Sequence, residues 1–405
     1  MLVKMKKYKF YYSIVDSYPA FRVDVIDLFR SLGQLGNVEV EWFMTSGKPT
    51  SKTQVLMGTE KVHLPIKLAG RLPIMKVINK VFYWVFDIFG LLNGAFKNIS
   101  LFQTRDKYFA SLFALLIARL KGVKYTYWCS YPFPEQDLEH ARNASGFKRL
   151  VYTITGYWGF FVLYKIVIPL SDHAFVQSEQ MRSDMAKYGI KPEKMTPVPM
   201  GVPNRIFDID TSHILIKSKQ FAYVGTLAAI RRMHVLIEAF AEVVKHYPDA
   251  TLVIVGDGIV PADRLGLEQQ ADQLGLSHAV TFTGFVPIDM AWEIAAASQC
   301  CISPFFPTKV LASTSPTKLV EYMALGRPVV CNDHPEQKQI IEASGAGLCV
   351  PWGMKAFADA MIWMLENPDH AEQMAKKGPD WVRKNRTYSV IAENVWPVYQ
   401  RILKQ

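Results

Sequence analysis

Short apolar runs alternate with amphipathic stretches through the second half of the chain, and this alternation restricts the fold more than any other feature. The apolar runs from Phe221 onward are FAYVG, TLVIVG, AVTFTGFV, CCISPF and PVVCN. Between them, stretches such as HVLIEAFAEVVKH place apolar residues three or four positions apart, which is the spacing of one helix face. Apolar strands separated by such helices are typical of a parallel sheet covered on both faces. Ligands of these sheets bind outside the carboxyl ends of the strands, so the loops there are the first places to look for a site.

The first half repeats the pattern less regularly, and 405 residues are too many for one ordinary core. Its strand-like runs are KFYYSIV, VEVEWFM, SLFQTR, KYTYWCS and HAFVQS. We therefore expect two α/β domains, linked near the proline-rich run 197–207. We place the first domain at 1–203, the second at 204–385, and a C-terminal helix at 386–405 that packs back on the first domain.

Positive charge is concentrated in the first half of the chain. Residues 1–205 hold 28 Lys and Arg against 15 Asp and Glu, whereas residues 206–405 hold 18 against 21. A basic half favours an anionic partner, such as a phosphate-bearing substrate or an acidic membrane surface, although a basic surface kept for solubility is the plain alternative. Nucleic acid is disfavoured as a partner, because the basic half contains no recognised binding motif.

Cysteines and carboxylates give little sign of a metal site. The five cysteines contain no CxxC, which indicates reduced, cytosolic thiols rather than a zinc site or a disulfide framework. Asp208 and Asp210 flank an isoleucine in the linker and are a weak metal candidate. We expect no metal and no other cofactor.

Two segments of the basic half combine large aromatic residues with Lys and Arg, namely 67–99 and 148–170. This combination suits an interfacial helix, because apolar side chains enter the acyl boundary while cations meet lipid phosphates. Lys165 and two glycines argue that the second segment does not span a bilayer. The alternative is that both segments are buried helices. The basic start of the chain reaches Asp16 too early for a secretory signal and is expected to be the first strand.

The most informative stretch is STSPTKLVEYMALGRPVV, residues 313–330. Ser313, Ser315 and Thr317 lie where a helix is expected to begin, so backbone amides and hydroxyls there can hold a phosphate. Lys318 adds a cation, and Glu321 can accept hydrogen bonds from two ribose hydroxyls. The alternative makes Ser315 an N-cap and Glu321 an ordinary surface residue.

Two other loops suit the same kind of ligand. Gly225 and Thr226 end one strand, and Arg231 precedes the next helix, so bare backbone and a guanidinium group can meet a diphosphate. Exposed backbone at Phe285 and Val286 can bind the edge of a nucleobase. Each loop taken alone also fits an ordinary turn, with exposed arginines in the first case.

Taken together, YVGTL, RR, LIEAF, LVIVGDG, VTFTGFVP and SPTKLVEYMALGRPVV resemble the retaining GT-B glycosyltransferases, in particular glycosyltransferase family 4. The resemblance is close over about residues 215–385 and loose before them. It implies two Rossmann-like domains facing across a cleft. It also implies a hexosyltransferase that is independent of metal and retains the anomeric configuration by front-face attack.

By the resemblance, Arg231 neutralises the donor diphosphate, amides from Ser315 to Lys318 bind the β-phosphate, and Glu321 binds the ribose. We therefore expect Arg231, Lys318 and Glu321 to be catalytic. The predicted donor-binding set is Gly225, Thr226, Arg231, Phe285, Val286, Ser313, Ser315, Thr317, Lys318, Leu319 and Glu321. Ser313 stands where the family has a glutamate that contacts the donor sugar, and Thr226 stands where it has an arginine.

The first half departs further from the family. In GVKYTYWCSYPFPE, Pro134 and Glu135 match, whereas Ser130 and Tyr131 replace the usual His-Asp pair. The glycine pair after the first strand is also replaced, by DSYPAFR. The predicted acceptor-side residues are Arg22, Arg105, Ser130 and Glu135.

The resulting prediction is a transferase that moves a sugar from a UDP- or GDP-sugar to a lipid-linked or envelope polysaccharide acceptor, as in lipopolysaccharide synthesis. We expect a cytoplasmic protein bound peripherally to the anionic inner face of the cell membrane. Two alternatives share the fold: a nucleotide-sugar 2-epimerase, and a protein that binds nucleotide sugars without catalysis.

Overall fold

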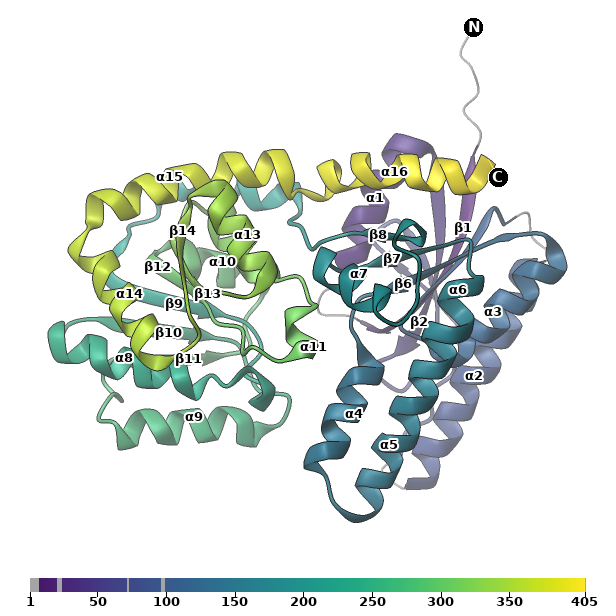
Figure 1. Cartoon of the computed structure of the whole chain (residues 1–405), viewed down its shortest axis with the longest axis horizontal. Helices are drawn as coiled ribbons and strands as arrows, with labels where there is room; N and C mark the ends of the chain where they lie inside the picture. The colour runs from purple at the N-terminus through teal and green to yellow at the C-terminus, as the bar shows by residue number, and fades with distance from the viewer. Residues whose placement is uncertain (1–6, 20–23, 71–72, 96–98, 405) are drawn as a thin grey trace, which may run out of the picture. The chain divides into compact units, whose positions relative to one another are not determined.

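The computed structural model describes residues 7–19, 24–70, 73–95 and 99–404 (Figure 1). The chain forms two compact units, Met1–Pro199 with Ile391–Gln405 and Met200–Val390. The sequence places the first boundary after residue 203, whereas the structure divides the chain between Pro199 and Met200. The last part of the C-terminal helix belongs to the first unit, which we call the N-terminal unit; the other is the C-terminal unit.

The N-terminal unit is built on an eight-stranded sheet with the order β3-β4-β2-β1-β5-β6-β7-β8. Its strands are β1 Tyr8–Tyr18, β2 Val38–Ser46, β3 Gln54–Met57, β4 Glu60–His63, β5 Leu101–Arg105, β6 Lys124–Cys129, β7 His173–Val176 and β8 Met195–Pro197. All neighbours are parallel except the hairpin of β3 and β4 at one edge. The five strand-like runs of the first half form β2, β5, β6, β7 and most of β1, so the apolar pattern predicted this sheet except for its two edges.

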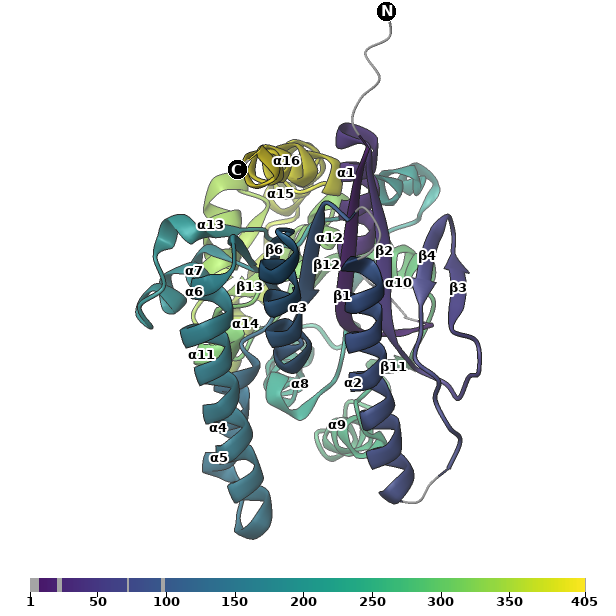
Figure 2. The ribbon, with the colours of Figure 1, turned by 90° about the vertical axis from the view of Figure 1, so that its right-hand side faces the viewer.

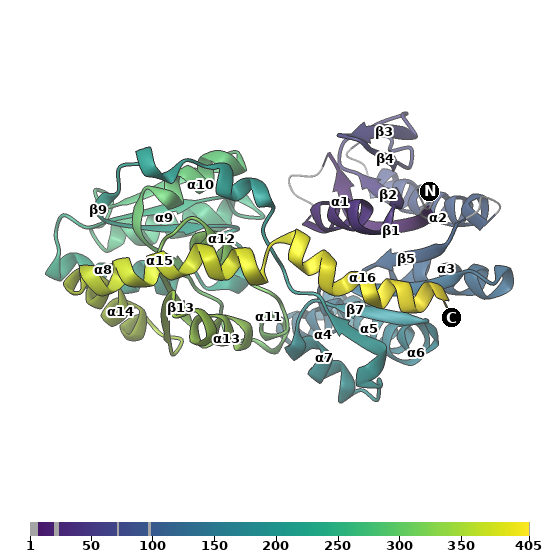
Figure 3. The ribbon, with the colours of Figure 1, turned by 90° about the horizontal axis from the view of Figure 1, so that it is seen from above.

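Helices cover both faces of this sheet. They are α1 Asp24–Gly36, α2 Pro73–Ala95, α3 Tyr108–Lys121, α4 Phe133–Asn143, α5 Gly146–Phe161, the π-helix η1 Val162–Val167, α6 Ile168–Leu170, α7 Glu179–Ala186 and α16 Tyr388–Lys404. One face packs on α1 and α16, where the rings of Phe10, Phe29 and Tyr399 meet. Figure 3 shows α16 running across the strands of this unit. The other face carries the core of α3, η1 and α7.

The C-terminal unit has a six-stranded parallel sheet with the order β11-β10-β9-β12-β13-β14. Its strands are β9 Lys217–Val224, β10 Thr251–Val255, β11 Val280–Gly284, β12 Ser298–Ser303, β13 Val329–Asn332 and β14 Gly347–Val350. The strand order reverses between β9 and β12, which is where doubly wound folds bind ligands.

Helices pack on both faces of this second sheet as well. They are α8 His234–His246, α9 Pro261–Gln273, α10 Ile288–Ala296, α11 Lys309–Ala312, α12 Thr317–Ala324, α13 Pro335–Ser344, α14 Met354–Glu366 and α15 Pro368–Asn385. The core against one face comes mainly from α8, α9 and α14, and that against the other from α10, α12 and α13. Short 3-10 turns at Pro192–Lys194, Asn204–Asp208, Thr211–His213 and Ala229–Arg231 lie in the connections.

Candidate active site

The turns after β9, β10 and β11 are joined by backbone hydrogen bonds at the carboxyl edge of the C-terminal sheet. The Gly225 N–H donates to Val255 O at 2.8 Å, and the Gly256 N–H donates to Gly284 O at 3.0 Å. Gly225 and Gly256 have φ of 152° and 133°, a region that L side chains rarely adopt. A Cβ at Gly225 would overlap the Lys318 side chain, and one at Gly256 would overlap the Gly225 backbone. Glycine therefore lets these turns and Lys318 pack at one point.

Two cations share this point. The Arg231 guanidinium and the Lys318 ammonium each lie 5.2 Å from the centre of the Phe305 ring, and Lys318 also lies 5.2 Å from the Tyr223 ring. Within the described residues neither cation forms a salt bridge, and the buried Nη1 of Arg231 has no hydrogen-bond partner. Burial, and then the charge of Arg231, lower the pKa of Lys318, while Glu321 opposes the shift. Two adjacent cations that form no salt bridge with a described carboxylate are an arrangement that suits an anion.

The 313–318 segment links two helices rather than simply starting one. Ser313 is the C-cap of α11, Pro316 is the N-cap of α12, and α12 begins at Thr317. Lys318 is therefore the second residue of the helix. Ser315 is buried and its hydroxyl donates to Glu336 Oε1 at 2.7 Å, so the interpretation of Ser315 as an N-cap is wrong. Leu319 faces the core of the unit.

Glu321 is not a surface residue. It is 4% exposed, and its Oε1 accepts a hydrogen bond from Trp292 Nε1 at 3.1 Å. On the same helix, the Tyr322 hydroxyl accepts from the Val224 N–H at 2.7 Å. Tyr322 thus fixes α12 to the end of β9, beside Gly225.

Thr226, Phe285 and Val286 lie in the turns that the glycines bring together. The Thr226 carbonyl accepts from the Tyr223 hydroxyl at 2.9 Å. Phe285 follows Gly284, which has φ of 67°, and its side chain is 60% exposed. Val286 is half-buried.

Sequence reasoning missed several residues that build this site, namely Tyr223, Trp292, Phe305, Tyr322 and Asn332. Both cations lie over the Phe305 ring. The Phe305 backbone is fixed by Asn332, whose side chain accepts a hydrogen bond from the Phe305 N–H at 2.7 Å and donates one to the Phe305 carbonyl at 2.9 Å. The position of Phe305, at the end of the predicted strand CCISPF, was a signal that could have found it.

The predicted acceptor-side residues belong to the N-terminal unit. Arg22 lies outside the described residues. Arg105 forms a long ion pair with Asp16, with 3.4 Å between Nη1 and Oδ2. Glu135 accepts from the Tyr164 hydroxyl at 2.8 and 3.0 Å.

Ser130 donates hydrogen bonds to a buried carboxylate, Asp106, that was not predicted from the sequence. Its backbone N–H donates to Asp106 Oδ1 at 3.1 Å, and its hydroxyl donates to Asp106 Oδ2. Asp106 has φ of 58°, directly after β5, and burial raises its pKa to about 6 although Arg105 and Ser130 oppose the shift. This carboxylate lies at the carboxyl edge of the N-terminal sheet, beside the reversal of strand order between β1 and β5.

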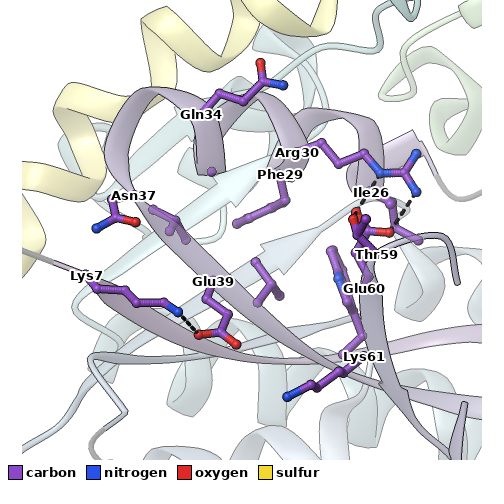
Figure 4. A pocket seen from close by; sticks show the side chains of 14 residues that line it. Lys7, Ile26, Phe29, Arg30, Gln34, Asn37, Glu39, Thr59, Glu60 and Lys61 are labelled. Carbon is purple, nitrogen blue, oxygen red and sulfur yellow. Dashed lines mark hydrogen bonds and ion pairs between the residues drawn. The ribbon is translucent and has the colours of Figure 1, made fainter. Parts of the chain in front are cut away.

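A separate cavity of about 530 Å³ lies beside α1 and β2 and contains none of the predicted site residues. Figure 4 shows that charged residues around it pair with each other. Lys7 Nζ lies 2.7 Å from Glu39 Oε2, and Arg30 donates two hydrogen bonds to Glu60 at 2.6 and 2.7 Å. These pairs contrast with Arg231 and Lys318, which form no salt bridge in the part of the chain that the structure describes.

No group of three or more His, Cys, Asp or Glu that could hold a metal occurs among the described residues. The five cysteines are free thiols, and four of them are buried.

The two units together have the GT-B glycosyltransferase fold. Over 98% of this chain and all of the other, the fold matches sucrose-phosphate synthase from Thermosynechococcus elongatus with a TM-score of 0.76 and 17% identity. Anabaena HepE in complex with UDP matches over 97% of this chain and all of its own, with a TM-score of 0.69 and 14% identity.

The sequence of the C-terminal unit matches a known family model. Residues 207–381 match the model of the glycosyl transferases group 1 family. Alpha-D-kanosaminyltransferase of Streptomyces kanamyceticus is 28% identical over 44% of this chain and 45% of its own length. Phosphatidyl-myo-inositol mannosyltransferase of Mycobacterium leprae is 30% identical over 42% of this chain and 43% of its own. The matches thus span less than half of these relatives.

Proposed function

We propose that this protein is a retaining glycosyltransferase that moves a hexose from a UDP- or GDP-sugar to a lipid-linked or envelope polysaccharide acceptor. The observation that carries the proposal is the pair Arg231 and Lys318, two cations on one aromatic ring with no salt bridge to either among the described residues. The match of residues 207–381 to the glycosyl transferases group 1 family model supports the transferase class.

The chemistry follows from the charge of the leaving group. When the bond between sugar and diphosphate breaks, negative charge grows on the β-phosphate. Fixed cations and amide donors stabilise that charge without reorganising. We assign this role to Arg231, Lys318 and the amides of 315–318, with no metal ion in the step. The leaving phosphate accepts the acceptor hydroxyl proton on the same face of the sugar, which gives retention.

The remaining donor contacts follow the turns of the C-terminal unit. Glu321 accepts from ribose hydroxyls, and the exposed backbone near Phe285 and Val286 binds the base. Gly225 and Thr226 border the phosphates, and Ser313 faces the sugar in place of a glutamate. The complex of Anabaena HepE with UDP supports a nucleotide ligand for this fold.

An outward-facing apolar stripe on α5 supports a membrane partner. Its exposed members repeat every three or four residues, as expected for one helix face: Phe147, Leu150, Val151, Ile154, Trp158 and Phe161. The buried side of the same helix has Gly156 and Gly159, which pack closely on Leu138 and Tyr108. Large apolar residues therefore face outward while glycines face the protein, the reverse of an ordinary surface helix.

Further features extend this apolar surface. Helix α2 exposes Phe82, Trp84 and Phe89, and Lys148 and Arg149 are exposed at the start of α5. In Figures 1 and 2, α2 and the α4–α5 pair extend past the sheet of the N-terminal unit on the same side. Helix Gly146–Leu170 is long and apolar enough to cross a membrane, with 39% of its most apolar window buried. We propose that it lies in the interface of an anionic membrane at the cytoplasmic face, because it carries cations and packs on α4.

A thermal-shift panel tests the donor proposal. A bound ligand raises the apparent melting temperature by mass action, so UDP, GDP or one of their sugars is expected to do so. Incubation of that sugar with membrane extract is then expected to produce a labelled lipid or polysaccharide. Epimerisation without any acceptor would favour a 2-epimerase instead. Tight binding with no transfer to any extract would favour a protein that only binds nucleotide sugars.

A further inference from the structure

The 313–318 segment is joined to a closed ring of four hydrogen bonds, one buried and three partly buried. The Ser315 hydroxyl donates to Glu336 Oε1 at 2.7 Å and accepts from the Met200 N–H at 2.8 Å. Arg386 Nη1 donates to the same Glu336 Oε1 at 2.6 Å and to Met200 O at 3.4 Å. Four residues that are distant in sequence therefore meet under the predicted phosphate site.

Burying the Glu336 carboxylate at this position costs free energy. It is 7% exposed, and its Oε2 is buried without a hydrogen-bond partner. Burial raises its pKa, while Arg386 and then Ser315 act in the opposite direction. Buried ion pairs are often no more stabilising than apolar packing of the same volume, so this pair needs a reason other than stability.

The neighbours of Glu336 suggest that reason. Asn332, His334 and Glu336 are spaced two residues apart, and each holds one part of the site. Asn332 fixes the Phe305 backbone. The His334 ring lies 2.9 Å from the Leu311 carbonyl through Nε2. Glu336 fixes Ser315. Segment 332–336 therefore positions the Phe305 ring under the cations and both ends of the 311–315 connection.

Resting on the proposed function, we propose that Glu336 is a positioning residue for the donor diphosphate. Held by Arg386, it fixes Ser315 and thereby directs the amides of 315–318 and Lys318 toward the β-phosphate. The nucleoside and the α-phosphate are bound by other turns, so the effect of Glu336 is confined to the β-phosphate. Arg386 and Met200 also lie close to the two places where the chain passes between the units.

Calorimetric titration with UDP and UMP, and with GDP and GMP, tests this role. For the nucleotide that binds, Glu336→Leu and Ser315→Ala are each expected to weaken diphosphate binding about tenfold, the scale of one buried hydrogen bond. Affinity for the monophosphate stays unchanged, because it lacks the β-phosphate. The double variant is expected to be no weaker than Glu336→Leu alone, since both changes remove the hydrogen bond between Ser315 and Glu336. Glu342→Leu, farther along α13, is the control.

Equal losses for diphosphate and monophosphate would overturn the proposal, because they indicate general damage to the unit. Unchanged affinity for both would overturn it as well. Failure of the unmodified protein to bind either diphosphate would instead overturn the proposed function on which this role rests.

Discussion

Lys318 is the residue whose chemistry should respond most directly to an anion. Its pKa is lowered by burial and by Arg231, so the free site favours the neutral amine more than water does. A bound diphosphate raises that pKa again. The complex then holds more protons than the free protein at pH values between the two pKa values, and binding strengthens as pH falls through that window.

We predict that UDP or GDP binding takes up protons at alkaline pH, where the phosphate itself is already fully ionised. Calorimetry in buffers of different ionisation enthalpy measures the uptake. Lys318→Met is expected to abolish it and to weaken binding about a hundredfold, as when one partner of a buried charge pair is removed. Lys309→Met changes an exposed lysine on α11 and is the control. Proton release, or equal uptake in both variants, would contradict this account.

The buried carboxyl group of Asp106 leads to a prediction about the stability of the folded protein. Its pKa in the folded protein is about 6, above the usual aspartate value of 3.8. Between these values the folded state binds more protons than the unfolded state, so the free energy of unfolding falls as pH rises. The shift corresponds to about 3 kcal/mol at most.

Asp106→Asn is therefore expected to reduce the loss of stability between pH 5 and pH 7.5 relative to the unmodified protein. Urea unfolding at the two pH values measures the difference, with Asp137→Asn in the same unit as the control. An identical pH dependence in Asp106→Asn and the unmodified protein would show that this carboxylate does not titrate as its burial implies.

At the scale of elements, hydrophobic periodicity predicted strands and helices, which depend on the local sequence. It missed contacts between residues that are distant in sequence. Five strands of the C-terminal unit, β9 to β13, follow their apolar runs, and α8 follows HVLIEAFAEVVKH, whereas β14 was not predicted. Sequence alone could not show that Ser315 bonds to Glu336, because 21 residues separate them. It also left open the alternative that Glu321 is a surface residue, since nothing local indicates its hydrogen bond with Trp292.

Helix α5 illustrates the same limit. Its sequence shows apolar and basic residues but not which side faces the protein, and only packing by Gly156 and Gly159 settles this. The π-helix η1 was also not predicted; it places Tyr164 on Glu135. Both features depend on contacts between helices.

The α5 stripe predicts a loss of membrane binding when it is made polar. The unmodified protein is expected to co-float with anionic liposomes at low salt. Changing Phe147 and Trp158 to Ser removes two large exposed side chains, 79% and 55% exposed, and is expected to reduce flotation at least tenfold while donor binding persists. The matched control changes Leu215 and Ile259, which are 86% and 76% exposed in the C-terminal unit. Equal losses in both variants would show that exposure alone, not α5, determines flotation.

At the scale of the whole molecule, charge and chemistry are divided between the units. The first 205 residues hold the excess of Lys and Arg, whereas the remaining residues are slightly acidic. The unpaired cations of the site nevertheless lie in the second, acidic half. The excess of positive charge in the first half therefore supports the proposed membrane face, whereas the proposed donor site depends on two individual residues, Arg231 and Lys318.

This division predicts two separate footprints in hydrogen exchange. UDP or GDP is expected to slow exchange in the turns at 225–232 and 304–321 of the C-terminal unit, where the amides and cations of the proposed site lie. Anionic vesicles are expected to slow exchange instead in α5 and α2, because lipid covers their exposed apolar faces. Mass spectrometry of peptides from the full chain measures both. If vesicles protected the C-terminal turns and left α5 unchanged, the membrane face would have been placed on the wrong unit, whatever the nucleotide result.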